Sequence, residues 1–493
     1  MTDSIRTVVI YGAGLAGQMT ALALSHNLPS CYKICLINDK AINSEYDVLY
    51  GSLCSPSSYD FHLLLGLSEP DLMFNSDAVF SYGTHYQQWG RSQRDWVQCF
   101  HLPLPVQESV QFHQSMLRAG IQNLEPYLVS AQAARRGVFA HPPQDPKIPL
   151  SRAEYGYQVS SDKYLEVLSS IINNATSEKI VQIETDSVTV CAGEQGIESI
   201  HLNNGDRVEA DWFIDCSGPN ASLLSKLSTK FISKRQVSFA SSNINDADID
   251  GDIKNKSTRT ITAYDFGWQS ETTLRGKVSK LTFFSEGDEN AALKKHGKYD
   301  FLDNVQLGSF EQAWSKNCVA IGQAASMIEP LTLAPMILLQ RDIERLLELI
   351  PLSKDNTIER KEFNRRFALD YEHACLFNDA FYQCDDHPDV LFWQQAQGLT
   401  VSEKLQIKLT QFESRAMISM FDLEPFNEED WLILHFGMQR KPARYSRFAE
   451  RHSNDQLLNW FASIERDISA IVNKMPPSVR YVSKMLDYLK AQP

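Results

Sequence analysis

A glycine-rich turn near the amino terminus constrains the fold of this 493-residue chain most strongly. Three consecutive β-branched residues at 8–10 predict a strand buried on both faces, and residues 19–24 are good helix formers. Between them the glycines have G-x-G-x-x-G spacing, which allows a tight turn, a close approach to a pyrophosphate and packing of helix on strand. An ordinary glycine-rich βα turn is the simpler alternative. We expect a dinucleotide site at Gly12, Ala13, Gly14, Ala16 and Gly17.

Composition indicates a globular protein with more than one subdomain. Hydrophobic residues make up 43% and charged residues 22% of the 493 positions, which are ordinary proportions for a globular protein. The chain is too long to fold around one simple core. The formal net charge of −14 argues against nucleic acid and anionic membrane surfaces as partners. The late apolar stretch 319–339 contains two prolines and a glutamate, which disfavours a membrane span.

Cysteine usage and the first residues predict a reduced, cytoplasmic setting. The nine cysteines are scattered without a disulfide framework, and the chain enters its first predicted strand with no secretory leader. Cys31 and Cys35 are close in sequence, but Cys35 lies within a strand-like run, so we expect core thiols and no metal site.

Predicted strands and helices alternate along the chain, as is typical of a mixed α/β fold. A second strand at 32–37 ends at Asn38 and Asp39, where dinucleotide folds usually place an acid that binds the ribose. Further strands are expected at 76–89, 180–183, 187–190, 197–202, 212–218, 258–264, 280–284 and 318–322, with a hairpin turn at 203–206. Helices are expected at 113–131, 160–172, 358–382, 403–421 and 454–473, and irregular stretches at 98–107 and 244–256.

Three segments in a fixed order indicate FAD as the dinucleotide. After the first glycine-rich turn come W-F-I-D-C-S-G at 212–218 and N-C-V-A-I-G-Q-A-A-S at 317–326. The late helix can attract a phosphate at its N-terminus. This arrangement resembles the flavoprotein monooxygenase superfamily, and an NAD(P)-dependent dehydrogenase fits it poorly. The further cofactor-binding candidates are Asn38, Asp39, Gly51, Asp215, Gly218, Gly322, Gln323 and Ala324.

Within that superfamily, residues 5–395 resemble the flavin-dependent tryptophan halogenases. The segments that carry the resemblance are Y-Q-V-S-S-D-K-Y-L at 157–165, D-C-S-G at 215–218, the segment 258–274 with G-W at 267–268, W-S-K-N-C-V-A-I-G at 314–322, E-P-L at 329–331 and F-W at 392–393. Each segment matches its family motif only modestly. The resemblance to the family rests on the order and spacing that all the segments share with it.

The resemblance implies an FAD-binding Rossmann-like domain with an interleaved substrate subdomain over residues 1–345, whose FAD parts are about 5–75, 151–224 and 305–345. It also implies a helical C-terminal region, 346–493, over the substrate pocket. The expected partners are a small aromatic substrate and a flavin reductase that supplies reduced FAD. A homodimer is compatible with the sequence, which does not fix the oligomeric state.

Halogenases of this family use reduced FAD, oxygen and halide to make hypohalous acid, which reaches a lysine and a glutamate beside the bound indole. Here the alignment places Ser81 at the lysine position, and no lysine occurs between Lys40 and Lys147. Thr332 replaces the glutamate, and Pro335 replaces a glycine of the halide-binding turn and removes an N–H. The resemblance therefore implies that the FAD-binding motifs are kept in this chain, whereas the residues that chlorinate the substrate in the family are replaced.

Two other family segments also differ. In G-W-x-W-x-I-P, Ser270 stands at the second tryptophan and Thr273 at the proline. The G-E-A-T loop beside the flavin reads G-S-L-C at 51–54.

Three functions stay open at this point. The first is oxidation of an indole, pyrrole or phenol by reduced FAD and oxygen, and the second is true halogenation by a displaced apparatus. The third is a non-catalytic flavin-binding or scaffold protein, which Asn38 and Gln323 would suit by weakening cofactor binding. The candidate catalytic or pocket residues are Ser81, Thr332, Trp268, His85 and His101, although each histidine also reads as an ordinary surface or core residue.

Overall fold

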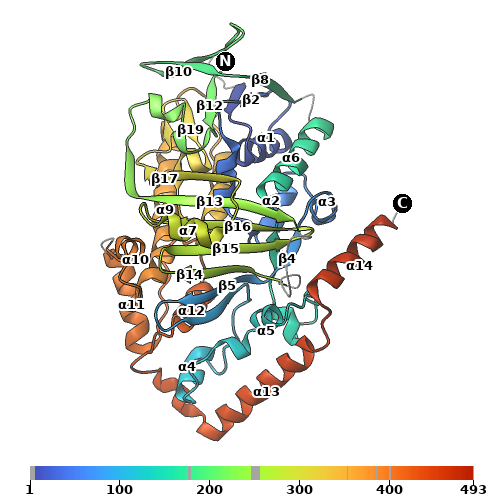
Figure 1. Cartoon of the computed structure of the whole chain (residues 1–493), viewed down its shortest axis with the longest axis vertical. Helices are drawn as coiled ribbons and strands as arrows, with labels where there is room; N and C mark the ends of the chain where they lie inside the picture. Colours follow the sequence, from blue (N-terminus) through green and yellow to red (C-terminus); the bar gives the residue numbers. More distant parts are fainter. Residues whose placement is uncertain are drawn as a thin grey trace.

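The computed structural model describes residues 6–175, 179–245, 256–351, 353–384, 386–398 and 401–491. One layer is a six-stranded sheet whose strand order is β18-β19-β12-β1-β2-β8, and all its strands are parallel except β18 (Figure 1). Its strands are β1 (Thr7–Tyr11), β2 (Lys33–Asp39), β8 (Ile180–Thr185), β12 (Trp212–Asp215), β18 (Trp314–Ser315) and β19 (Cys318–Ala320). The mixed α/β fold with a Rossmann-like sheet is therefore confirmed.

Three helices pack together beside this sheet. α1 (Leu15–Asn27) follows β1 directly and lies against α6 (Ser161–Ala175) and α8 (Ala334–Glu348). Nearly every residue of α1 is buried, which explains the apolar composition that the sequence shows there. The helix predicted at 160–172 corresponds to α6.

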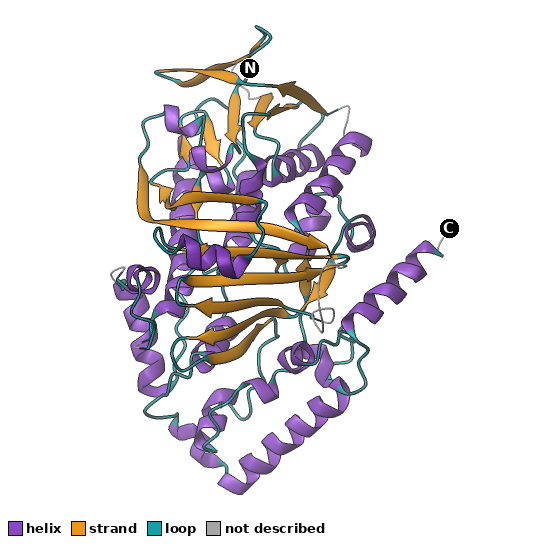
Figure 2. Cartoon of the chain, viewed as in Figure 1, coloured by secondary structure: helices purple, strands orange, loops and turns teal. Residues whose placement is uncertain are grey.

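The second large layer is an eight-stranded sheet with the order β20-β17-β13-β16-β15-β14-β5-β6. It runs across the middle of the molecule, and only the β14–β5 pair is parallel (Figure 2). Its strands are β5 (Gly83–Trp89), β6 (Arg94–Cys99), β13 (Phe231–Asn245), β14 (Arg259–Tyr264), β15 (Gly267–Leu274), β16 (Lys277–Phe284), β17 (Phe301–Phe310) and β20 (Ser326–Met327).

Two three-stranded sheets complete the strand structure. One joins β9 (Val188–Gly193), β10 (Gly196–Leu202) and β11 (Arg207–Val208), with the predicted hairpin turn between the last two. The other joins β3 (Leu53–Cys54), β7 (Gly156–Gln158) and β4 (Val79–Ser81).

The single strand predicted at 76–89 is wrong, because the chain changes sheet inside it. β4 and β5 are separated at Tyr82, and Gly83 has φ +133° and such close contact with β6 that a Cβ would lie 2.2 Å from the Gln98 carbonyl oxygen. The helix predicted at 113–131 is likewise two helices, α4 (Phe112–Arg118) and α5 (Val129–Arg135). Most of the loop predicted at 244–256 lies outside the described residues.

Helices dominate the chain after residue 333. Those predicted at 358–382, 403–421 and 454–473 are present as α9 (Thr357–Tyr382), α11 (Glu403–Arg415) and α13 (Asn454–Val472). The remaining ones are α10 (Leu391–Gln397), α12 (Glu428–Gly437) and α14 (Ser478–Lys490), which extends from the body as an arm (Figure 1). Earlier in the chain lie α2 (Ser58–Leu64), α3 (Glu69–Asn75) and α7 (Glu289–His296). None of the described helices is both long and apolar enough to cross a membrane.

We predict that Gly17→Ala destabilises the protein by roughly 3 kcal/mol or more. A Cβ at this position would lie 1.7 Å from the Gly12 carbonyl oxygen, so the turn must open to admit it. Gly120→Ala is the control, because a Cβ at Gly120 meets nothing within 4 Å, and its positive φ of +77° alone should cost about 1 kcal/mol. Thermal unfolding compares the two variants, and equal losses would contradict the assigned close packing.

Candidate active site

The glycine-rich turn joins β1, α1 and the end of β12. Gly12 has φ +106°, and a Cβ there would lie 2.4 Å from the carbonyl oxygen of Cys216, just after β12. Its own N–H donates to the Ile37 carbonyl on β2. The turn therefore lies at the carboxyl edge of the parallel strands, where dinucleotide folds bind their ligand.

A carboxylate from another segment occupies the N-terminus of α1. Asp47, on a 3-10 helix (Ser44–Tyr50), accepts a hydrogen bond from the Leu15 N–H at 2.9 Å, and Gly14 leaves room for its side chain. Burial raises the pKa of Asp47 to about 7 against the opposing Leu15 hydrogen bond, and the charge of Glu45 raises it further. The helix terminus thus accommodates an anion, as a phosphate site requires.

The two candidate ribose-binding residues at the end of β2 already have partners. Asp39 is buried and accepts hydrogen bonds from the Tyr11 hydroxyl at 2.6 Å and the Ala41 N–H at 2.9 Å. Asn38 donates to the Glu184 carboxylate on the neighbouring β8 at 3.0 Å.

Asp215 is used within its own loop. Its fully buried carboxylate accepts hydrogen bonds from the Ser217 N–H and hydroxyl and from the N–H groups of Leu223 and Leu224. Burial raises the pKa of Asp215, although these four donors oppose the rise. Asp215 therefore shapes the loop that carries Gly218, where a Cβ would lie 3.9 Å from the Gln323 side-chain oxygen.

The late glycine segment contacts the same 3-10 helix as the early one. Gly322, Gln323 and Ala324 form a short 3-10 helix, and the Gln323 N–H donates to the Tyr50 hydroxyl at 3.0 Å. Gln323 also donates from its side chain to the Tyr46 carbonyl at 2.8 Å. The cavity that remains here measures only about 10 Å³, and Tyr50 lines it. Residues 44–51 thus lie along all the glycine turns of the predicted flavin site.

Ser81, the residue at the aligned lysine position, is fully buried at the end of β4. Its hydroxyl accepts a hydrogen bond from the Gln158 side chain at 2.9 Å and donates to the Gly83 carbonyl at 3.2 Å. The hydroxyl is therefore committed to local backbone and side-chain contacts.

Trp268 and Thr332 are linked through Glu329, which the sequence analysis named only as part of E-P-L. Glu329 is buried, ion-pairs with Arg235 and accepts hydrogen bonds from the Trp268 indole N–H and the Tyr382 hydroxyl, each at 2.5 Å. Burial opposes the charge of Arg235, but Glu329 raises the pKa of that guanidinium above its ordinary value.

Asn378 extends this cluster to Thr332. The Asn378 amide donates to the Glu329 carbonyl at 2.8 Å and accepts from the Thr332 hydroxyl at 2.6 Å. Thr332 is thereby tied to α9.

The turn after Glu329 is fixed by two further buried side chains. The Arg259 guanidinium donates to the Pro330 carbonyl at 3.0 Å and to the Leu331 carbonyl at 2.8 Å, and the Tyr86 hydroxyl also donates to Leu331 at 2.8 Å. These contacts connect β14 and β5 of the eight-stranded sheet to the start of α8.

The two candidate histidines are separate from this cluster. His85 lies 2.9 Å from Asp95, which with Arg135 lines a cavity of about 420 Å³ next to α12. His101 is buried with its ring bonded to the Leu102 carbonyl at 2.6 Å, and burial lowers the pKa of His101 to about 4 against that bond. His101 is therefore a neutral core histidine at ordinary pH.

Comparison with known proteins was made over the whole chain. The tryptophan halogenase family model matches residues 7–454. The chain belongs to the tryptophan halogenase family.

Individual relatives are distant but extend over most of the chain. It is 22% identical to tryptophan 6-halogenase ThaL of Streptomyces albogriseolus over 451 residues, which cover 85% of this chain and 84% of the relative. BrvH, a flavin-dependent halogenase from Brevundimonas sp. BAL3, superposes with a TM-score of 0.87 at 24% identity and covers 97% of this chain and 99% of its own. Xcc4156, a flavin-dependent halogenase from Xanthomonas campestris, gives 0.86 at 24% identity with 98% of each chain covered. These superpositions show that the fold is shared.

The turn at the start of α8, where the resemblance predicts the halide site, contains one engaged N–H and one proline. The Ala334 N–H donates to the Thr332 hydroxyl at 3.2 Å, within the same turn. Pro335, in the first turn of α8, has no N–H. The backbone N–H of the first of these two adjacent residues is already hydrogen-bonded, and the second residue has no N–H.

The sequence analysis missed Asp47, Arg235 and Tyr382 as parts of the site. Asp47 comes from the 3-10 helix Ser44–Tyr50, and Arg235 lies in β13, and the sequence pattern predicts neither element. Tyr382 was placed correctly at the end of a helix, but its hydroxyl meets Glu329 only through the tertiary fold. Arg235 stands in the polar stretch S-K-R-Q at 233–236, so the sequence gives no sign that its side chain is buried and paired.

We predict that Glu329→Gln lowers the free energy of unfolding by about 3–5 kcal/mol, because it leaves the Arg235 charge unpaired in the interior. The double variant Glu329→Gln/Arg235→Met should recover more than half of the loss. Exposed Glu311→Gln is the control and should stay within about 0.5 kcal/mol of the wild type. Urea unfolding measures all three, and a Glu329→Gln variant as stable as the control would contradict the role of the ion pair.

Proposed function

We propose that this chain is an FAD-dependent monooxygenase of the tryptophan halogenase family that oxidises a small aromatic substrate without halogenating it. Reduced FAD comes from a separate flavin reductase, and oxygen is the oxidant. The observation that carries the proposal is the turn at the start of α8, where Ala334 donates to Thr332 and Pro335 has no N–H to offer a halide. A buried, hydrogen-bonded Ser81 hydroxyl in place of the lysine amine supports the same conclusion.

The residues present fit a flavin dinucleotide. Gly12, Gly14 and the Leu15 N–H would hold the pyrophosphate, and the hydrogen bond from Leu15 to the Asp47 carboxylate shows that this N–H accommodates an acidic oxygen. Gly218, Gly322 and Gln323 would hold the rest of the cofactor from the opposite side. When bound, FAD supplies the reducing electrons and the site of oxygen activation.

The chain's own residues exclude water and fix the site around the cofactor. Trp268 stacks on Phe283 with ring centroids 4.7 Å apart, which gives an apolar wall. Glu329 and Arg259 hold that wall and the following turn in one arrangement, so the substrate meets a rigid, desolvated surface.

Product analysis tests this function. The protein, FAD, a flavin reductase and NADH are incubated with indoles, pyrroles and phenols, with and without bromide, and products are read by mass spectrometry. We expect products that gain oxygen and no halogen, at rates independent of bromide. A brominated product would overturn the proposal. The control is the same mixture without the chain.

True halogenation is the second candidate, because the family model and relatives such as ThaL are halogenases by name. It requires a halide site and an amine outside the aligned positions. The bromide arm of the experiment decides between the two, since only this candidate gives a product with the bromine isotope pattern.

We also predict that FAD binds this chain more tightly as the pH falls from 8 to 6. A phosphate at the Leu15 N–H must replace the Asp47 carboxylate, whose pKa is raised to about 7 by burial. Protonation below pH 7 removes its negative charge, while the pyrophosphate keeps its own. Asp47→Asn should therefore bind FAD about tenfold more tightly than the wild type at pH 8 and equally at pH 6.

Flavin fluorescence quenching measures this affinity without turnover. Asp60→Asn, an exposed acid in the first turn of α2, is the control and should keep the wild-type pH dependence. A wild-type dissociation constant that is flat from pH 6 to 8 would contradict the competition.

A further inference from the structure

A polar chamber lies between the eight-stranded sheet and the segment that contains Gly51. It measures about 60 Å³ and is lined by strands β13, β15 and β16, by Gly51 and Ser52, and by Ser160 and Ser161 at the start of α6. A water needs about 10–15 Å³, so the chamber holds roughly four to six water-sized groups, which is enough for a polar ring substituent and the part of the ring that carries it.

The sheet register sets the character of the chamber wall. Phe239, Phe283 and Trp268 form one cross-strand row. Residues two positions along each strand point to the same face. The next two rows, in the same strand order, are Ser241, Leu281 and Ser270, then Asn243, Ser279 and Thr272. The face therefore changes from aromatic to hydroxyl-rich and amide-bearing along the strands.

Two serines of these rows lie on the chamber wall, and neither hydroxyl has a hydrogen-bond partner in the described part of the chain. Ser241 is 6% and Ser270 is 5% exposed, both line the chamber, and neither side chain has a hydrogen bond to a described residue. Buried hydroxyls are normally bonded, so their groups are available to a ligand. Ser270 is also where the family motif has its second tryptophan, so the shorter side chain leaves the space open.

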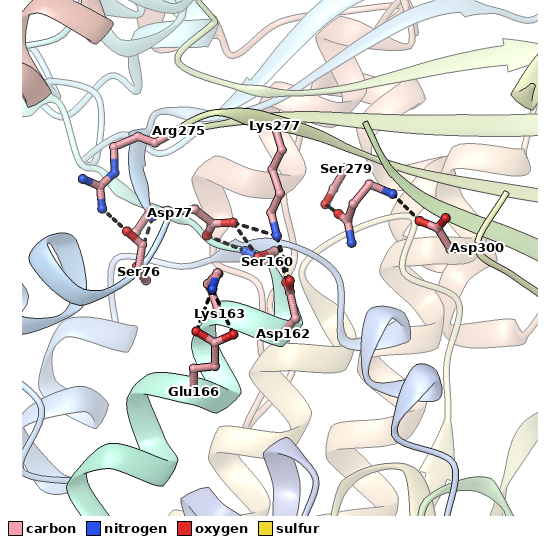
Figure 3. A network of polar contacts seen from close by, with 12 residues as sticks. Ser76, Asp77, Ser160, Asp162, Lys163, Glu166, Arg275, Lys277, Ser279 and Asp300 are labelled. Carbon is pink, nitrogen blue, oxygen red and sulfur yellow. Dashed lines mark hydrogen bonds and ion pairs between the residues drawn. The ribbon is translucent and has the colours of Figure 1, made fainter. Parts of the chain in front are cut away.

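The cations beside the chamber are already engaged, and two acids, Glu45 and Asp300, also line it. Lys280 ion-pairs with Glu271 at 3.1 Å, and the Arg259 guanidinium donates to backbone carbonyls. At the chamber's end, Lys277 lies between Asp77 at 3.1 Å and Asp162 at 2.8 Å, beside Ser160 (Figure 3). Among the described lining residues no cation is left for a carboxylate, so a neutral ligand fits best.

We propose that this chamber binds the neutral hydroxyl- or carboxamide-bearing ring of the substrate, next to the flavin site at Gly51. The proposal rests on the proposed function and narrows its substrate class to polar aromatics such as phenols and aryl amides. Ser241 and Ser270 bond the ring substituent, and Leu281, which lines the chamber between them, contacts the ring.

Ligand-observed saturation-transfer NMR tests the site with 4-hydroxybenzamide, and with benzoate and indole for comparison. The protein is studied with and without oxidised FAD. We expect 4-hydroxybenzamide to bind in both states and at least about fivefold more tightly than either comparison compound, because each lacks part of the hydrogen bonding or adds a charge. Ser241→Ala/Ser270→Ala should weaken it about tenfold.

Ser270→Trp, which refills the space, should abolish 4-hydroxybenzamide binding, and Ser187→Trp on the exposed β8–β9 turn is the matched control. Displacement of the compound by FAD would assign the chamber to the cofactor and overturn the proposal. Absent binding, equal binding of benzoate or indole, or full binding by the double alanine variant would also overturn it. None of these readouts requires turnover, so a chain that fails to oxidise aromatics can still show or lack the site.

Discussion

The buried ion pair between Arg235 and Glu329 joins the parts of this molecule that form the site. Arg235 comes from β13, Glu329 precedes α8, and the same carboxylate receives Trp268 from β15 and Tyr382 from α9. Arg235 also lies over the rings of Tyr382 and Phe392, 5.4 and 5.1 Å from their centroids. Neither charge is tolerable there without the other, so the sheet, the late helices and the turn before α8 are specified together.

The cofactor side depends on a different constraint, the unsatisfied N–H groups at the start of α1. Asp47 accepts a hydrogen bond from one of them, and the Tyr50 hydroxyl accepts one from the Gln323 N–H. One segment, 44–51, therefore contacts both the early and the late glycine turns. An acid held there by a helix terminus still carries a desolvation cost, which is why its pKa is raised rather than lowered.

The sequence predicted what depends on local spacing. The glycine turn, the buried run at 212–215 and the helix periodicity of α9 and α13 are each visible within about twenty residues. β13 was not predicted because its first six residues are half-buried or exposed and only residues 237–242 are continuously buried, so no single period describes it. Asp47 and Asp215 show the same limit for the site: both are acids near the glycines, and only the fold shows that one caps α1 and the other closes its own loop.

The positions at which the chain departs from its family are connected by one side chain. Arg259 lines the polar chamber and also holds the carbonyls of Pro330 and Leu331, directly before the turn that lacks halide donors. The short side chain of Ser270 opens space in the chamber that Arg259 lines. Pro335 removes an N–H from the turn that follows the carbonyls held by Arg259. Both changes therefore lie next to segments that this one side chain fixes. Under the proposed function, the altered turn before α8 prevents halogenation, and the hydroxyl-lined space beside the flavin loop gives the same cofactor a different substrate position. The proposal needs both changes, because an altered turn by itself does not account for the hydroxyls of Ser241 and Ser270 on the chamber wall.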